Sequence, residues 1–271
     1  MSGAVDMNSL RMSFHFFGKS RLRHYPGLAF YFLGRALWQN TGLRLFEQKQ
    51  LQFKGLSLVA DVRGMSGLYF LHQILIEEIY RLPAIENGMD VNILFDVGAN
   101  CGFYALTQCV RRPHLQARCF EPQPATFRHL QQNITANHAD DRVKGVNTAV
   151  GAVPGQCELK VSDQSSMGVV ASSSVNLLDG DNRPMVTHNI TVPMITLDDY
   201  AERENLWPDI IKVDVEGYEP EVLRGAQRCL ARARFIIAEC DTDELTAQNK
   251  SLLIDAGFRL EQRGPILFGV K

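Results

Sequence analysis

Two short runs of this sequence place acids and glycines where strands of a parallel sheet would end. In the first run, apolar residues lead into Asp96, and Gly98 and Gly102 follow it. Glycine lets a backbone pass close to a ligand where a Cβ would obstruct it. A carboxylate at this point suits an organic cation or a hydroxyl, whereas a phosphate-binding loop would avoid it. The run therefore favours a nucleoside ligand that carries positive charge and has no pyrophosphate.

Glu121 lies nineteen residues beyond Gly102, at the end of the next predicted strand. An acid with this spacing binds ribose hydroxyls in dinucleotide-binding folds, so Glu121 is the expected ribose ligand, with a surface carboxylate as the alternative. The first run and Glu121 together predict S-adenosylmethionine, a nucleoside with a sulfonium, as the cofactor. Backbone contacts to it are expected from Gly98, Ala99, Asn100 and Gly102. Asn100 could instead occupy a left-handed turn position, which asparagine tolerates.

The second run, from Ile210 to Glu219, ends a buried strand in Asp214 and places Glu216 two residues later. Two carboxylates just beyond a strand tip could act as acid and base, or could hold a divalent cation through oxygen. The alternative for Glu216 and Glu219 is a favourable interaction with the N-terminus of the following helix. Catalysis is the expected role of Asp214 and Glu216, and stabilisation of the helix is the expected role of Glu219.

Two charged residues fall inside predicted buried strands and need partners. Lys212 is unusual in a sheet covered on both faces, so it is expected to pair with an acid such as Glu239. Asp96 could orient the amino group of the cofactor, or could bind only the amides of its own loop. If the chain binds a divalent metal, Asp214 and Glu239 are the expected ligands.

The elements that must position these residues alternate from residue 90 onward. Strands are predicted at 91–96, 117–121, 146–150, 209–214 and 234–240, and helices at 101–112, 124–138, 218–232 and 243–256. Residues 157–161 and 189–196 are predicted to form an inserted extended pair, and 258–270 to hold closing strands. Such alternation predicts an α/β fold with a mostly parallel, doubly wound sheet and helices on both faces. Because ligands bind beyond the carboxyl ends of such strands, the four strand-end acids should converge there: Asp96, Glu121, Asp214 and Glu239.

Residues 1–89 are predicted to form a separate accessory region before a catalytic domain at 90–271. Within this region, 51–60 is predicted to be a strand broken by Gly55, and 68–80 a helix. Residues 1–50 contain seven Lys or Arg against two Asp or Glu, with many aromatic residues. The basic cluster Lys19, Arg21 and Arg23 could hold this region on an anionic membrane surface. The alternative is a helical cap packed on the catalytic domain or on a second subunit.

Composition excludes several classes of protein. The net charge of −2 provides no global basic field for nucleic acid. The six cysteines are scattered without a C-x-x-C pair, which argues against a zinc site and favours a reduced, cytoplasmic compartment. The early sequence has no apolar signal segment, and its most apolar stretch is too short to span a bilayer. The expected location is therefore cytoplasmic, with peripheral membrane contact as the open question.

Taken in order, several motifs resemble the FkbM family of S-adenosylmethionine-dependent methyltransferases. They are Asp96-Val97-Gly98-Ala99-Asn100-x-Gly102, Glu121-Pro122-x-Pro124-x-x-Phe127, Asn147-x-Ala149-Val150-Gly151, Ile195-Thr196-Leu197-Asp198-Asp199, Lys212-Val213-Asp214-Val215-Glu216-Gly217-Tyr218-Glu219 and Val222-Leu223-x-Gly225-Ala226. The resemblance covers roughly residues 91 to 241. It implies a class I, Rossmann-like methyltransferase sheet. It also implies O-methylation of a hydroxyl on a sugar, glycolipid, polyketide or similar small molecule.

The resemblance also implies roles for single residues. The loop from Asp96 to Gly102 would bind the methionine part of the cofactor, and Glu121 its ribose. Asn147 and Ala149 would lie near the adenine, and Ser166 would contribute a further cofactor contact. Asp214 and Glu216 would face the methyl acceptor. Related sugar O-methyltransferases hold a divalent metal on acids near these positions, which leaves metal dependence open here.

Three other functions compete with this interpretation. A nicotinamide-dependent oxidoreductase shares the glycine turn and the ribose acid, but Tyr104 stands where the third glycine of its loop would be. A non-catalytic binding module would not need Asp96, Glu121 and Asp214 together. A nucleic-acid methyltransferase is disfavoured by the near-neutral charge and by the lack of an N-P-P-Y-like motif. The sequence does not indicate the oligomeric state.

Overall fold

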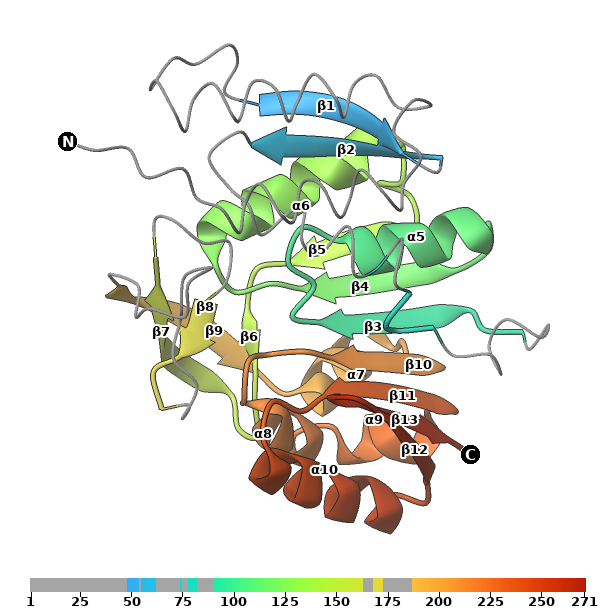
Figure 1. Ribbon diagram of the computed structural model, residues 1–271, viewed down its shortest axis with the longest axis vertical. Coiled ribbons are helices and arrows are strands. Elements are labelled where there is room, and N and C mark those ends of the chain that lie inside the picture. Colours follow the sequence, from blue (N-terminus) through green and yellow to red (C-terminus); the bar gives the residue numbers. More distant parts are fainter. Residues whose placement is uncertain are drawn as a thin grey trace.

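The 271-residue chain is represented by a computed structural model (Figure 1). The structure describes residues 48–53, 55–61, 74, 78–81, 90–162, 168–172 and 187–271. Ser166 and the basic cluster of Lys19, Arg21 and Arg23 lie outside the described residues. So does most of the helix predicted at 68–80, and its described end, Glu78 to Arg81, forms a turn closed by the Arg81 amide and the Glu78 carbonyl.

A seven-stranded sheet runs through the centre of the described chain. Its strands are β3 (Ile93–Val97), β4 (Gln116–Phe120), β5 (Val143–Val146), β10 (Ile210–Val213), β11 (Phe235–Glu239), β12 (Arg259–Arg263) and β13 (Ile266–Val270). They lie in the order β12-β13-β11-β10-β3-β4-β5, and β13 is antiparallel to both of its neighbours. The other neighbouring pairs are parallel. This is the class I methyltransferase sheet that the motifs predict.

Helices cover both faces of this sheet (Figure 1). On one face lie α5 (Phe103–Arg111) and α6 (Pro124–Ala136), and on the other lie α7 (Leu197–Glu204), α8 (Glu219–Arg224), α9 (Gln227–Arg232) and α10 (Asp243–Asp255). Successive side chains of β3 point to opposite faces of the sheet. Leu94 belongs to the core on the side of α5 and α6, and Phe95 to the core on the side of α7 to α10. A strand buried on both sides must be apolar throughout, which explains the unbroken runs in the sequence.

Two predicted elements are divided in the structure. The strand expected at 146–150 is β5 and then β6 (Ala149–Val150), which belongs to a second sheet. The helix expected at 218–232 breaks into α8 and α9 near Gly225, where an added Cβ would lie 2.0 Å from the Gly151 carbonyl oxygen. The Asp198 carboxylate accepts hydrogen bonds from the backbone amides of Arg228 and Cys229 at the start of α9. These long-range contacts interrupt a helical pattern that looks continuous in sequence.

The second sheet has the order β6-β9-β7-β8 and borders the carboxyl ends of the central strands. It contains β7 (Gly155–Val161), β8 (Gly168–Val170) and β9 (His188–Ile195). β7 and β9 form the antiparallel extended pair that the sequence predicts. Its inner face packs around Leu159, Val170 and Val192.

The stretch predicted as one broken strand is a hairpin of β1 (Gln48–Phe53) and β2 (Leu56–Asp61). Gly55, with φ +83°, supplies the left-handed turn residue between them. The hairpin lies along α6 (Figure 1). Asn137, which caps α6, accepts from the Ser57 amide at 2.7 Å and donates to the Ser57 carbonyl at 2.5 Å. Leu56 is part of the same core as α6, and the division at residue 89 remains a prediction.

Replacing Asn137 should loosen this hairpin. Asn137→Ala removes both hydrogen bonds to Ser57, which are partly buried, so we expect the free energy of unfolding to fall by about 1–3 kcal/mol. Urea unfolding measures the loss, and amide hydrogen exchange should locate it in β2. Gln132→Ala, on the exposed side of α6, is the matched control and should change stability by less than about 0.5 kcal/mol. Equal stability of both variants would contradict the anchoring role.

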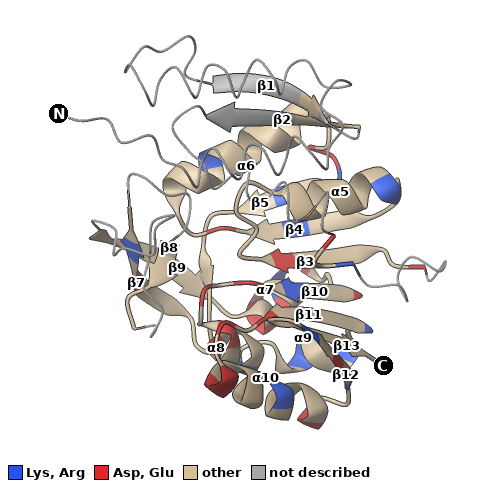
Figure 2. Cartoon of the chain, in the orientation of Figure 1, with Lys and Arg blue, Asp and Glu red and all other residues tan. Residues whose placement is uncertain are grey.

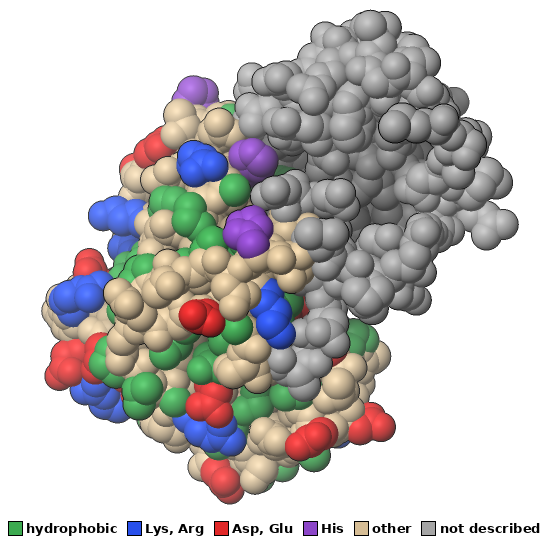
Figure 3. Space-filling model, turned by 90° about the vertical axis from the view of Figure 1, so that its left-hand side faces the viewer, with side chains coloured by type: hydrophobic (Ala, Val, Ile, Leu, Met, Phe, Trp, Pro, Cys, Tyr) green, Lys and Arg blue, Asp and Glu red, His purple; other side chains and the backbone are tan. Residues whose placement is uncertain are grey.

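Charged side chains of both signs are interspersed with apolar ones on the face beyond the carboxyl ends of the central strands (Figure 3). Within the described ranges, no helix is both long and apolar enough to cross a bilayer.

Candidate active site

A cavity opens at the point where the chain leaves β3 toward one face of the sheet and leaves β10 toward the other face. Such a switch point is where open α/β sheets bind ligands. Its walls are the loop after β3, the residue after β4, the segment 148–150 and the loop after β10, with Leu159 and Val170 from the second sheet. Acidic and basic segments meet where β3 and β10 end (Figure 2).

Protein packing also requires glycine at the two positions of the first loop. Gly98 has φ +72°, and a Cβ there would lie 1.7 Å from the carbonyl oxygen of Asp214. Gly102 has φ +81°, and its Cβ would meet the Leu130 side chain at 2.4 Å. The expected clearance for a ligand at these glycines remains a prediction, and the structure adds this packing requirement. Gly98 allows the β3 loop to pack against the β10 loop.

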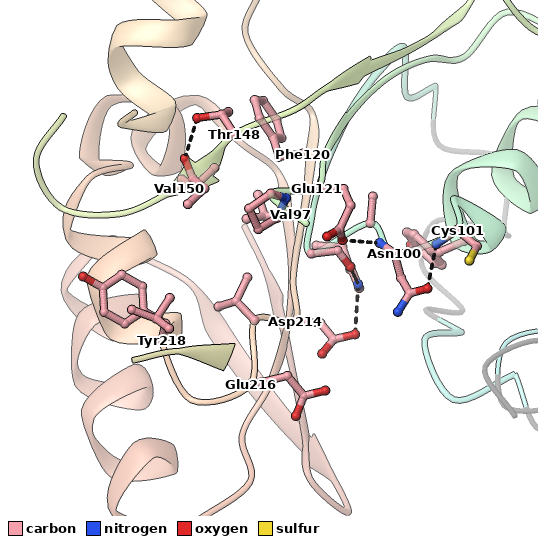
Figure 4. Close-up of a pocket in the computed structure, with 18 of the residues that line it drawn as sticks. Val97, Asn100, Cys101, Phe120, Glu121, Thr148, Val150, Asp214, Glu216 and Tyr218 are labelled. Atoms are coloured by element: carbon pink, nitrogen blue, oxygen red, sulfur yellow. Dashed lines mark hydrogen bonds and ion pairs between the residues drawn. The ribbon is translucent and has the colours of Figure 1, made fainter. Parts of the chain in front are cut away.

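Asn100, in the loop after β3, is hydrogen-bonded to Glu121, which follows β4, at the place where the cofactor is expected (Figure 4). Asn100 has φ +50°, the left-handed alternative, and its backbone amide donates to Glu121 Oε2 at 3.0 Å. Glu121 Oε1 accepts from the Gln123 amide at 2.9 Å. Each carboxylate oxygen has two lone pairs, so both retain capacity for a ligand hydroxyl. Burial raises the pKa of Glu121 to about 7, although these two amides oppose the shift.

Lys212 binds different partners from the one that the sequence suggested. Its ammonium lies 3.0 Å from Asp214 Oδ2 and 3.4 Å from Asp96 Oδ1, and it donates to the Gly98 carbonyl at 2.9 Å. The predicted pairing of Lys212 with an acid is confirmed, but the acids are Asp214 and Asp96 rather than Glu239, because the strand register places Asp96 beside Lys212. Burial alone would lower the pKa of Lys212, but the carboxylates of Asp214 and Asp96 raise it instead.

Asp96 lies behind this lysine and does not line the cavity. Its side chain is fully buried, and neither oxygen has a hydrogen bond of normal geometry. Burial raises its pKa, and Lys212 opposes the shift. A direct contact between Asp96 and the amino group of the cofactor remains a prediction. The structure shows the Asp96 carboxylate close to the Lys212 ammonium, whose charge it neutralises.

Asp214 and Glu216 lie side by side in the loop after β10, with their carboxyl groups turned the same way (Figure 4). Glu216 has φ +55°, and burial, followed by the charge of Asp214, raises its pKa to about 8. Glu219 Oε1 accepts from the amides of Val215 and Gly217, each at 3.1 Å. Glu219 thus stabilises the loop that carries the two acids, which agrees with its expected structural role.

Tyr80 is a cavity residue that the sequence analysis missed. Its hydroxyl lies 2.9 Å from Asp214 Oδ2 and 2.6 Å from Glu239 Oε2. Glu239 itself does not line the cavity. The four strand-end acids therefore do converge, but only Glu121 and Asp214 reach the cavity. No local pattern could have identified Tyr80, because its partners are 134 and 159 residues away.

The arrangement of Asp214 and Glu239 does not suit a divalent cation. The Tyr80 hydroxyl occupies the space between the two oxygens that would have to share the ion. Among the residues that the structure describes, no cluster of three or more His, Cys, Asp or Glu could hold a metal.

The segment after β5 differs in detail from the prediction. Ala149 lines the cavity, together with Thr148, which the sequence analysis passed over. Asn147 is exposed, and its amide donates to the carbonyls of Glu121 (2.8 Å) and Pro122 (3.1 Å). Asn147 thus fixes the turn that carries the expected ribose ligand, and its direct contact with adenine remains a prediction.

The geometry can be compared with known proteins. The profile of the methyltransferase FkbM domain matches residues 96–260, which is more than half of the chain. The chain belongs to the FkbM methyltransferase family. Its sequence is 28% identical to the hexuronic acid methyltransferase AglP of Haloferax volcanii over 195 residues, covering 67% of this chain and 73% of AglP. It is also 28% identical to the 2-O-methyltransferase NoeI of Sinorhizobium fredii over 160 residues, covering 56% of this chain and 65% of NoeI.

One solved structure shows a distant overall similarity. A SAM-dependent methyltransferase from Agrobacterium tumefaciens superposes with a TM-score of 0.46 at 10% identity, covering 85% of this chain and 71% of that one. The fold assignment rests on the strand order rather than on this weak similarity. As a family member, the protein is an S-adenosylmethionine-dependent methyltransferase, and the oxidoreductase and non-catalytic alternatives are set aside.

Proposed function

We propose that this enzyme methylates a hydroxyl of a saccharide or similar small molecule, with Asp214 as the base. The observation that carries the proposal is the position of Asp214, which lines the same cavity as Glu121 and whose carboxylate is held by Lys212 and Tyr80. Relatives support the acceptor class, since one acts on hexuronic acid and another is a 2-O-methyltransferase.

The residues present fit S-adenosylmethionine, which supplies a methyl group bound to a positively charged sulfur. Glu121 has lone pairs free for the ribose hydroxyls, and the loop 98–102 offers backbone groups beside it. The acids of the lining complement the positive charge.

Asp214 is held in a geometry suited to taking a proton. Its Oδ2 accepts from Lys212 and Tyr80, which leaves Oδ1 for an acceptor hydroxyl. The acceptor O–H bond breaks as the new O–C bond forms, and the proton moves to Asp214. The electron pair of the broken S–C bond remains on sulfur, so charge balances. The protein mainly aligns the acceptor and removes its proton.

The lining also points to an uncharged acceptor. Lys212 is the one basic side chain among the described lining residues, and three oxygens already engage it. A uronate carboxylate would therefore be buried without a cation, which is costly. We propose a neutral hydroxyl-bearing acceptor.

An acceptor panel tests both parts of the proposal. Radiolabelled S-adenosylmethionine is incubated with the enzyme and methyl glucoside, glucosamine or glucuronic acid, with and without EDTA. We expect transfer to the neutral sugar at least about tenfold above transfer to the uronate, a difference of about 1.4 kcal/mol. We also expect activity to survive EDTA, because Tyr80 separates Asp214 from Glu239. Transfer to none of these sugars would overturn the saccharide proposal, and a preference for the uronate would overturn the charge argument.

A further inference from the structure

Tyr80 reaches the candidate active site from a part of the chain that precedes the family match at 96–260. It sits in the turn from Glu78 to Arg81, and its side chain is only 6% exposed. Arg111 on α5 donates to the Glu78 carboxylate at 2.8 Å, and Arg263 on β12 donates to the Arg81 carbonyl at 2.9 Å. The turn is thus fixed on both sides to the catalytic sheet and its helices.

The ring of Tyr80 is held as firmly as its turn. It packs edge to face on Tyr104, with centroids 5.6 Å apart and planes at 81°. The Lys212 ammonium lies 5.3 Å from its centroid. These contacts direct the Tyr80 hydroxyl toward Asp214 and Glu239. We call Tyr80, Asp214 and Glu239 the Tyr80 trio.

Proton counting restricts the charge state of the Tyr80 trio. The tyrosine hydroxyl has one proton but lies within hydrogen-bond distance of two carboxyl oxygens. Both contacts are favourable only if one carboxyl is protonated and donates to the tyrosine oxygen. Asp214 has Lys212 at 3.0 Å, which favours its ionised form. Burial, followed by the charge of Asp214, raises the pKa of Glu239 to about 8, so Glu239 carries the proton near neutral pH.

We propose that Tyr80 is a positioning residue of the methyl-transfer site, which orients the Asp214 carboxylate while protonated Glu239 orients Tyr80. This inference rests on the proposed function, because it concerns the same base. Tyr80 donates to Asp214 Oδ2, and Glu239 donates to Tyr80. With Oδ2 bound by Tyr80 and Lys212, the carboxylate cannot rotate, and Oδ1 stays directed at the acceptor. The segment before the family domain thereby completes the site.

Tyr80→Phe provides the first test, because it keeps the ring and removes only the hydroxyl. We expect kcat to fall about 10- to 100-fold, the effect of one lost hydrogen bond to a charged group. The Kd for S-adenosylmethionine and the KM for the acceptor should each stay within about threefold. Tyr200→Phe is the matched control, since Tyr200 is buried against Phe95 and Phe120 and touches no member of the trio. It should leave kcat unchanged.

The pH dependence of kcat/KM distinguishes a positioning role of Tyr80 from a purely structural one. The charged and titratable groups around the hydroxyl are Lys212, Asp214 and Asp96 from the β3–β10 side, Glu239 from β11, Tyr104 from α5 and Glu216 from the β10 loop. In Tyr80→Phe the pH dependence of kcat/KM should change, because Asp214 and Glu239 both lose the hydroxyl that joins them. Glu239→Gln keeps a donor toward Tyr80 and should retain about tenfold more activity than Glu239→Leu. An unchanged kcat and profile in Tyr80→Phe would overturn the inference.

Infrared difference spectroscopy tests the trio without any acceptor. At pH 7 the wild type should show a carboxylic-acid carbonyl band that Glu239→Gln removes and Tyr80→Phe shifts. Absence of that band, or a band unmoved by Tyr80→Phe, would overturn the inference. If no sugar is methylated but the band behaves as expected, the proposed function fails while the hydrogen-bonded trio stands. This variant set also covers the case in which Tyr80→Phe does not fold.

Discussion

Asp214→Asn is expected to lower kcat by about 10²- to 10⁴-fold, the usual contribution of a positioned general base. The asparagine amide preserves the size of the side chain but cannot take up the proton of the acceptor hydroxyl. The two amides that bind the Glu121 carboxylate belong to Asn100 and Gln123 rather than to Asp214, so the Kd for S-adenosylmethionine should stay within about threefold. Single-turnover transfer of a radiolabelled methyl group measures the first effect, and isothermal titration measures the second.

Asp255→Asn, on the exposed end of α10, serves as the control for loss of one carboxylate and should behave as wild type. Thermal unfolding of both variants shows whether each is folded at the assay temperature. A wild-type rate in folded Asp214→Asn would remove Asp214 as the base. A loss of cofactor affinity equal to the loss of rate would instead place Asp214 at the cofactor.

Glu121→Ala is expected to weaken S-adenosylmethionine binding by about 1–3 kcal/mol, or roughly 5- to 150-fold in Kd. The variant removes the acceptor of the ribose hydroxyls, and also the carboxylate that accepts from the amides of Asn100 and Gln123. Glu158→Ala, exposed on β7, is the matched control and should leave Kd unchanged. Unaltered affinity in folded Glu121→Ala would eliminate the ribose assignment.

The same residue predicts opposite pH trends for binding and stability. With the pKa of Glu121 raised to about 7, cofactor affinity should rise from pH 6 to pH 8, because the ionised carboxylate is the better acceptor. The unfolded chain releases this proton near pH 4.5, so the raised pKa stabilises the ligand-free fold at low pH. That contribution is lost as pH rises through 7. Titration calorimetry and urea unfolding at several pH values measure the two trends, and Glu121→Gln should flatten the first.

Sequence patterns correctly predicted the features of the fold that depend on neighbouring residues. The apolar runs that end in Asp96, Glu121 and Asp214 predicted strands of the central sheet to within one or two residues. A strand buried on both faces admits few polar residues, so an acid marks its end well. Glu121 was expected at the cavity for the same reason, and it is there. The pairing of β7 with β9 also followed from two extended runs on either side of a polar loop.

The errors come from contacts between residues far apart in the chain. The partner of Lys212 depends on register between β3 and β10, and the sequence analysis had no access to that register. The break between α8 and α9 depends on the approach of Gly151 to Gly225, which interrupts an otherwise helical pattern. The packing of Gly98 against the Asp214 backbone was not predicted either, because the two residues are distant in sequence.

The sequence by itself determined the family, the order of the central elements and the ends of the strands that face the cavity. The family follows from the ordered motifs that resemble FkbM methyltransferases. The element order and the strand ends follow from hydrophobic periodicity and from acids and glycines at turns, which are properties of neighbouring residues. Tertiary structure alone decided that Tyr80 joins Asp214 to Glu239, that Lys212 neutralises Asp96, and that Asn147 binds the carbonyls of Glu121 and Pro122. Each of these depends on which side chains a packed sheet brings within hydrogen-bond distance. Burial then changes their proton affinities, which no short stretch of sequence specifies.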